Sequence, residues 1–190
     1  MLNKKFGVIL LAAGRSTRFG QNKLLTLIND RPMLLETFAV YRQCFDLISV
    51  IINPEDVQVQ ELLIRLQINY LICPGADKGM GESLSFGVTQ NSEWDGWFIA
   101  LSDMPYIQVS TLSALKKSLQ KHQIVAPRYN MQRGNPVGFS RHYYSQLCLL
   151  SGDCGAQNML QEHAQTVELI DVDDQGVIID IDRVEDVFFR

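Results

Sequence analysis

The sequence predicts one doubly wound α/β domain, in which helices cover both faces of a mostly parallel sheet. Short runs rich in Val, Ile and Leu alternate with longer segments whose apolar residues recur every three or four positions. This alternation is typical of parallel strands joined by crossover helices. The chain has 190 residues, of which 46% are hydrophobic and 20% charged, and these values favour a single domain over residues 1–190.

Strands are predicted wherever a short apolar or β-branched run is closed by polar or turn-forming residues. In the first half of the chain such runs lie at 6–10, 47–52, 68–73 and 97–101. Apolar residues at helical spacing predict helices at about 32–44, 55–66 and 79–89. Pro32 suits the first turn of the first helix, because a missing N–H costs nothing there. Leu66 is expected to face the core from the second helix.

The second half of the chain continues the alternation. Strands are predicted at 123–127, after the turn at 134–139, at 167–172 and at 177–181. Helices are predicted at 109–121, 143–150 and about 157–162, with a final helix at the end of the chain. Ser110 is positioned to cap the first of these helices, since a serine hydroxyl accepts a hydrogen bond from a first-turn N–H. No repeat or low-complexity segment interrupts the pattern.

Composition excludes several classes of function. The net charge of −4 gives no general basic surface, so we expect no nucleic-acid partner. The four cysteines form no C-x-x-C pair, which argues against zinc and disulfides and favours reduced thiols in the cytoplasm. No apolar run approaches the roughly 20 residues of a membrane span. The N-terminus imitates a short signal peptide, but the apolar stretch is followed at once by Arg15 and Arg18, so we interpret it as a buried strand.

The loop after the first strand, at 10–23, has the composition of an anion-binding cradle. The residues whose small side chains let backbone N–H groups approach a phosphate are Ala12, Ala13 and Gly14. The cations that follow them are Arg15, Arg18 and Lys23. Arginine offers a planar fork of donors, whereas lysine offers a compact charge that can follow a moving phosphoryl group. The glycine spacing matches neither a P-loop nor a dinucleotide fingerprint.

A carboxylate follows the fourth predicted strand directly. Asp103 lies in the string S-D-M-P at 102–105, where the carboxyl end of a central parallel strand opens onto the usual ligand crevice. Mg²⁺ binds oxygen ligands and often takes one or two carboxylates together with substrate phosphates. We therefore predict that Asp103 is a metal ligand.

The loop at 10–23 resembles the nucleotide-binding loop of the nucleotidyltransferases, L-A-A-G-x-x-x-R-x-G-x-x-K. The matching residues are Leu11, Ala12, Ala13, Gly14, Arg18, Gly20 and Lys23. Further motifs follow in order: G-M-G-E-S at 79–83, S-D-M-P at 102–105, R-G-N-P-V at 133–137, S-G-D-C-G-A at 151–156 and D-I-D at 180–182. Together they resemble the molybdenum cofactor cytidylyltransferases of the MobA-like superfamily. The resemblance implies a Rossmann-like fold of the nucleotide-diphospho-sugar transferase type.

The resemblance also implies roles for individual residues. Catalytic residues would be Arg18, Lys23 and Asp103, with Arg18 and Lys23 steadying the triphosphate and the leaving pyrophosphate. Nucleotide-binding residues would be Leu11, Ala12, Ala13, Gly14, Arg15, Arg18, Lys23, Gly79, Gly81, Ser83 and Ser102. The second metal ligand would be Asp182, or else Asp180. On the acceptor side would lie Arg133, Asn135, Pro136 and Asp153. For 79–83 a plain helix cap is the alternative to contact with the base and ribose.

The implied reaction transfers CMP from CTP to the phosphate of a molybdopterin-type cofactor that carries molybdenum, with release of pyrophosphate and with Mg²⁺ as the metal. A molybdenum hydroxylase or its maturation chaperone would be a further partner. Two departures from the family pattern weaken the match locally. Gln157 replaces an Arg that could contact an acidic acceptor, and Arg183-Val184 replaces Thr-Pro before the final helix.

Four alternatives remain open at this point. A guanylyltransferase would carry LAGG and an Asp before the Lys, where this chain has LAAG and Asn22. Other cytidylyltransferases and sugar-nucleotide enzymes of the superfamily would have Pro in place of Asn22. A non-catalytic carrier of the molybdenum cofactor would need the loop but not both carboxylates. A dinucleotide-dependent oxidoreductase would need the missing glycine fingerprint.

Overall fold

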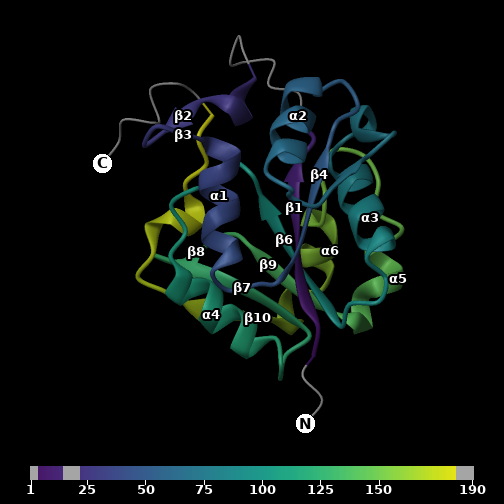
Figure 1. Cartoon of the computed structure of the whole chain (residues 1–190). Helices are drawn as coiled ribbons and strands as arrows, with labels where there is room; N and C mark the ends of the chain where they lie inside the picture. The colour runs from purple at the N-terminus through teal and green to yellow at the C-terminus, as the bar shows by residue number, and fades with distance from the viewer. Residues whose placement is uncertain (1–3, 15–21, 183–190) are drawn as a thin grey trace.

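A computed structural model describes residues 4–14 and 22–182, and an eight-stranded mixed sheet runs through its centre (Figure 1). Its strands are β1 (Phe6–Ala12), β4 (Leu47–Ile52), β5 (Tyr70–Ile72), β6 (Gly96–Leu101), β7 (Ile124–Tyr129), β8 (Gln132–Arg133), β9 (Val137–Ser140) and β10 (Val167–Asp171). They pair in the order β10-β7-β9-β6-β1-β4-β5, and β8 pairs with β7. β9 runs antiparallel to β6 and β7, whereas β1, β4, β5 and β6 are parallel neighbours. A separate antiparallel pair joins β2 (Leu27–Ile28) and β3 (Arg31–Pro32).

Helices cover both faces of the sheet, which confirms the predicted doubly wound arrangement. The helices are α1 (Met33–Arg42), α2 (Val57–Arg65), α3 (Met80–Gln90), α4 (Val109–Ser118), α5 (Tyr144–Leu147) and α6 (Gln157–Glu162). Buried residues of α1, α2 and α4 share one apolar cluster with Val8 and Leu10 of β1. Those of α3, α5 and α6 share the other with Ile9 and Leu11. Every residue of β1 is buried, because a central parallel strand is covered on both faces.

In the part of the chain that the structure describes, each helix falls short of the length and apolar character needed to cross a membrane.

The segment 172–182, which we call the strap, differs from the prediction. A strand was expected at 177–181, but the strap contains a 3₁₀ turn at Gln175–Ile178 and, after Val172, pairs with none of the strands that the structure describes. Its apolar residues face two separate clusters, since Val177 packs into the main core and Ile181 packs with Ile28 and Met33. Figure 1 shows the strap in yellow, passing from β10 beside α1 toward β2 and β3.

Three local expectations were also wrong. Ser110 lies inside α4 and does not cap it; the Asp174 carboxylate accepts the hydrogen bond from Gln108 N instead. Leu66 follows the end of α2 and is 45% exposed. The helix expected at 143–150 is reduced to a 3₁₀ turn at Arg141–Tyr143 followed by the short α5.

The close packing of α3 on the sheet generates a test of the fold. A Cβ at Gly87 would lie 2.7 Å from Cγ2 of Ile9 and 3.0 Å from Cδ1 of Ile51. We therefore expect Gly87→Val to lower the free energy of unfolding by about 1–3 kcal/mol, the usual cost of overpacking a core, in a urea titration. Gln90→Val, at the exposed end of the same helix, should change it by less than about 0.5 kcal/mol. Equal losses in the two variants would contradict this packing.

Candidate active site

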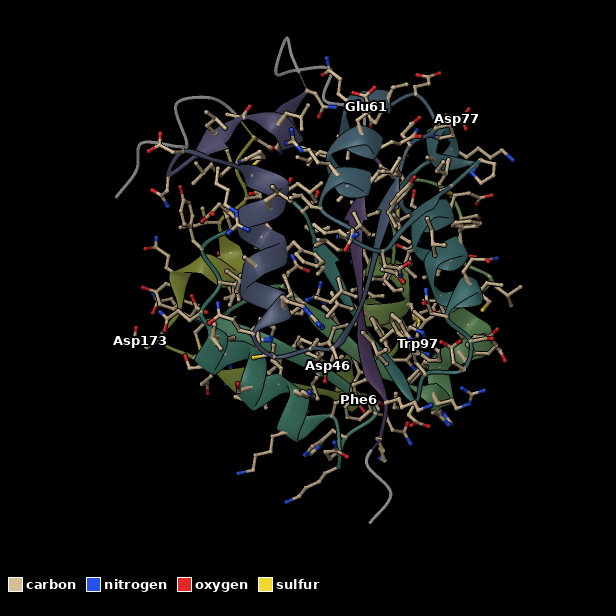
Figure 2. All side chains as sticks on the ribbon, in the orientation of Figure 1. Phe6, Asp46, Glu61, Asp77, Trp97 and Asp173 are labelled. Atoms are coloured by element: carbon tan, nitrogen blue, oxygen red, sulfur yellow. The ribbon has the colours of Figure 1, made fainter. Side chains whose placement is uncertain are left out.

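A cavity of about 500 Å³ lies at the carboxyl ends of β1 and β6. Its walls are formed by Leu11, Ala12, Ala13, Gly14, Lys23, Leu24, Ala76, Asp77, Gly79, Met80, Ser83, Leu101, Ser102, Asp103, Asp153, Asp180 and Asp182. Figure 2 shows Asp77 at one end of the molecule and Phe6 and Trp97, near the starts of β1 and β6, toward the other. Parallel sheets usually bind ligands at this carboxyl edge, and the sequence-predicted location agrees with it.

An ammonium group joins three distant parts of the chain in this cavity. Lys23 Nζ lies 2.9 Å from Oδ2 of Asp103 and 2.8 Å from Oδ1 of Asp182. Lys23 begins a 3₁₀ turn, Lys23–Leu25, which is capped because Asn22 Oδ1 accepts a hydrogen bond from Leu24 N. Asp103 follows β6, and Asp182 ends the strap. Residues from the first, middle and last parts of the chain are thus held within ion-pair distance.

Burial and neighbouring charges both shift the pKa values of the groups around Lys23. The Lys23 side chain is 12% exposed, so burial alone would lower its pKa. The hydrogen bonds that Lys23 Nζ donates to Asp182 and Asp103, with the charges of these carboxylates, outweigh that effect and raise the pKa above its ordinary value. Burial raises the pKa of the neighbouring Asp180 carboxyl, and the charges of Asp182 and Asp103 raise it further. Lys23 is therefore charged at neutral pH and lies beside a group of three carboxyl side chains.

The same carboxylates fit a divalent cation. Asp103, Asp180 and Asp182 each offer an oxygen, and these three oxygens lie within 4.8 Å of one another. Asp103 Oδ1 is also buried and accepts no hydrogen bond from any residue in 4–14 or 22–182. A buried oxygen of this kind is costly unless it gains a partner. Carboxylate oxygens are the ligands that Mg²⁺ and Mn²⁺ prefer, so the donor set suits either ion.

The small-residue turn after β1 forms the adjoining wall. Ala12 and Ala13 are buried and line the cavity together with Gly14. A Cβ at Gly14 would meet none of the described atoms within 4 Å, so the space above this backbone is open to a ligand. Arg15, Arg18 and Gly20 lie outside the described residues. The structure therefore places Ala12, Ala13, Gly14 and Lys23 at the cavity, and their roles, like those of the two arginines, stay predictions.

The glycines of the G-M-G-E-S motif have a packing role that the sequence did not indicate. Gly81 N donates a hydrogen bond of 2.7 Å to Gly152 O, and a Cβ at Gly81 would lie 2.7 Å from Ser151 O. A Cβ at Gly79 would lie 2.5 Å from Asp153 Oδ1, and the φ of Gly79 is +120°. Of this motif, Gly79, Met80 and Ser83 line the cavity. Ser83 lies inside α3 and does not cap it.

The residues expected on the acceptor side divide into two groups. Asp153 lines the cavity, whereas Arg133, Asn135 and Pro136 are not among its described lining residues. Asn135 N instead donates a hydrogen bond of 2.8 Å to Val177 O in the strap. Within the described residues, the R-G-N-P-V motif thus contacts the segment that carries Asp180 and Asp182.

Five lining residues were not predicted from the sequence, namely Leu24, Ala76, Asp77, Met80 and Leu101. Each lies within or near a predicted motif, and this proximity was the signal that could have identified them.

Comparisons with known proteins agree with this geometry. The family model described as the MobA-like NTP transferase domain matches residues 8–167. The purine catabolism protein PucB of Bacillus subtilis is 28% identical over 94% of this chain and 92% of its own length. The nicotine blue oxidoreductase of Paenarthrobacter nicotinovorans is 26% identical over 95% of this chain and 93% of its own.

Among solved structures, the protein Rv0371c of Mycobacterium tuberculosis superposes with a TM-score of 0.85 at 26% identity, covering 97% of this chain and 96% of that one. A complex of Rv0371c with manganese superposes with a TM-score of 0.82 at 25% identity, covering 96% of each chain.

The ion pairs of Lys23 generate a prediction about stability. We expect Lys23→Met to lower the free energy of unfolding by about 1–3 kcal/mol in metal-free buffer, since partly buried carboxylates lose their counter-charge. Added Mn²⁺ should then raise the melting temperature of the variant more than that of the parent, because the ammonium no longer competes for the carboxylates. Lys78→Met, an exposed lysine beside the cavity lining, is the matched control and should melt like the parent. A variant that gains no more from Mn²⁺ than the parent would contradict a shared position for the two cations.

Proposed function

The chain belongs to the MobA-like NTP transferase family, and within it we propose that the protein transfers CMP from CTP to the phosphate of a molybdopterin-type cofactor that carries molybdenum. The observation that supports nucleotidyl transfer most directly is the convergence of Lys23, Asp103 and Asp182 beside the open turn at 11–14. A triphosphate needs both a backbone cradle and cations. The cavity offers the first, and the carboxylates offer a place for a metal.

The proposed reaction balances without a covalent intermediate. An oxygen of the acceptor phosphate forms a bond to the α-phosphorus of CTP, the bond from that phosphorus to the bridging oxygen breaks, and pyrophosphate leaves. A phosphate acceptor is already ionised, so no general base has to remove a proton. The described lining of the cavity accordingly contains no histidine. Displacements of this kind depend mainly on positioning and on neutralisation of charge.

Each residue then has a distinct task. The backbone at 11–14 receives the triphosphate, and Lys23 exchanges its two carboxylates for phosphate oxygens as the nucleotide enters. Asp103 and Asp182, with Asp180 as the third candidate, would hold Mg²⁺, which when bound neutralises charge across the phosphates. Arg18 and Arg15 would add cations from the part of the loop outside the described residues.

The choice of CTP and of a molybdenum cofactor rests on the sequence motifs. LAAG with Asn22-Lys23, together with G-M-G-E-S, is the combination that resembles the cytidylyltransferase branch. The names of the two relatives differ, one referring to purine catabolism and the other to an oxidoreductase, so neither name supplies the activity. The manganese complex of Rv0371c supports a divalent metal. The product would pass to a molybdenum hydroxylase or its maturation chaperone, in the cytoplasm.

Product analysis tests the proposal. The purified protein is incubated with Mg²⁺, the molybdenum cofactor and CTP, GTP or ATP in separate reactions, and products are identified by mass. We expect a cytidylyl product and pyrophosphate with CTP. A guanylyl product would move the assignment to the guanylyltransferase branch. Pyrophosphate release with none of the nucleotides would exclude nucleotidyl transfer to this acceptor.

Asp103→Asn separates an enzyme from a carrier. The substitution keeps the size of the side chain and removes the charge that would hold the metal, so kcat should fall on the order of 10²- to 10³-fold. The melting temperature should change little by comparison. Asp46→Asn is the matched control, because the Asp46 side chain is 98% exposed and Figure 2 shows it far from Asp77. If Asp103→Asn turns over as fast as Asp46→Asn, Asp103 does not hold the catalytic metal.

A further inference from the structure

We propose that Asp174 is a positioning residue for the metal-binding carboxylates. Its buried side chain fixes the strap, residues 172–182, against the loop that carries Asp103, and thereby places Asp182 at the cation position. The inference rests on the proposed function, because it concerns the same carboxylates. Asp174 lies eight residues before Asp182 and does not line the cavity, so any effect on the metal must act through the strap.

Asp174 has a buried carboxylate, and both of its oxygens accept hydrogen bonds. The residue is 2% exposed. Its Oδ2 accepts hydrogen bonds from Gln108 N at 2.8 Å and from Thr111 Oγ1 at 2.7 Å, and its Oδ1 accepts one from Gly176 N at 3.0 Å. Gln108 and Thr111 belong to the start of α4, whose own N-cap side chain makes no capping bond. A carboxylate at a helix N-terminus is favoured by the helix dipole, so α4 gives the strap a rigid anchor.

Contacts between the strap and the loop at 103–108 continue from this anchor to the site. A Cβ at Gly176 would lie 2.2 Å from Tyr106 O, so the two backbones pack directly on each other. Further along, Ile181 N donates a hydrogen bond of 3.0 Å to Asp103 O. The strap therefore contacts this loop at three points. Asp174 contacts Gln108, Gly176 contacts Tyr106, and Ile181 contacts Asp103.

The other side of the strap is held by the R-G-N-P-V motif. Asn135 N donates to Val177 O, and a Cβ at Gly134 would lie 2.3 Å from the same oxygen. Val172 N donates a hydrogen bond of 3.0 Å to Arg128 O of β7, but beyond Val172 the strap pairs with none of the described strands. These contacts and the Asp174 anchor therefore take the place of sheet hydrogen bonds along the rest of its path. These contacts hold the strap on its approach to Asp182, whose side chain is 57% exposed.

Replacing the Asp174 carboxylate should therefore act on metal affinity. In Asp174→Asn the side chain keeps its size, but its NH₂ group can only donate hydrogen bonds. It therefore cannot accept the hydrogen bonds that one of the two Asp174 oxygens accepts in the parent. Supporting residues outside the ligand shell typically change metal affinity by about 10- to 100-fold. We expect the dissociation constant for Mn²⁺ to rise by about tenfold or more.

Mn²⁺ binding to the full chain, followed by electron paramagnetic resonance with Mn²⁺ alone as the probe, tests this expectation. Asp173→Asn is the matched control, because Asp173 is the exposed neighbour that Figure 2 shows at the surface. Leu147→Ala controls for stability, since Leu147 is fully buried in the opposite apolar cluster. If Mn²⁺ affinity depends on the contacts of Asp174 and not on overall stability, the dissociation constants of both controls should lie within about twofold of the parent value.

Thr111 provides a second pair of variants that does not alter the charge. Thr111→Val removes one donor to Asp174 and should weaken Mn²⁺ binding, whereas Thr111→Ser keeps the hydroxyl and should bind like the parent. This pair decides the question if Asp174→Asn does not fold.

Three results would overturn the positioning role: parental Mn²⁺ affinity in Asp174→Asn, equal affinity in Thr111→Val and Thr111→Ser, or a loss in Leu147→Ala that matches the loss in Asp174→Asn. A parent protein that binds neither Mn²⁺ nor CTP in the presence of Mn²⁺ would instead contradict the proposed function itself.

Discussion

The Lys23 ammonium, held between Asp103 and Asp182, is the interaction on which the arrangement of the site depends. Carboxylates repel one another at short range, so Asp103, Asp180 and Asp182 need a cation wherever the chain brings them together. Lys23 supplies that charge in the free protein. In the proposed reaction, the metal replaces Lys23 as the counter-charge of the carboxylates, and the triphosphate replaces the carboxylates as the partner of Lys23. Binding of the metal and binding of the nucleotide would therefore favour each other.

The fold brings these charges together by two different routes. Asp103 is placed by the sheet, since it lies two residues after β6, whose last residues, Ala100 and Leu101, pair with β1. Asp182 is placed by the strap, which reaches the same point without strand pairing. One proposed metal ligand, Asp103, therefore follows a rigid strand, whereas the position of the other, Asp182, is set by contacts of the strap at Asp174, Gly176, Val177 and Ile181. If the proposal holds, small changes in the strap should alter metal affinity and leave the sheet intact.

Much of the fold could be predicted because local pattern and tertiary environment agree. A strand buried on both faces has a continuous apolar sequence, as in β1, and helices with one apolar face pack on either side. Asp103 could be located because the carboxyl end of a strand is a general binding position. The strap could not be predicted, since Val177 and Ile181 look like strand residues but pack into separate clusters. Two of the partners of Asp174, Gln108 and Thr111, lie more than 60 residues away in sequence, and no local pattern marks them.

A crystal structure of the protein with Mn²⁺ and a non-hydrolysable CTP analogue would test the central claim most directly, because anomalous scattering locates manganese independently of the protein atoms. The account predicts a manganese peak bonded to oxygens of Asp103 and Asp182, with the triphosphate over the turn at 11–14 and Lys23 Nζ moved onto phosphate oxygens. Manganese bound elsewhere, or Lys23 still paired with both carboxylates while the nucleotide occupies the cavity, would contradict it.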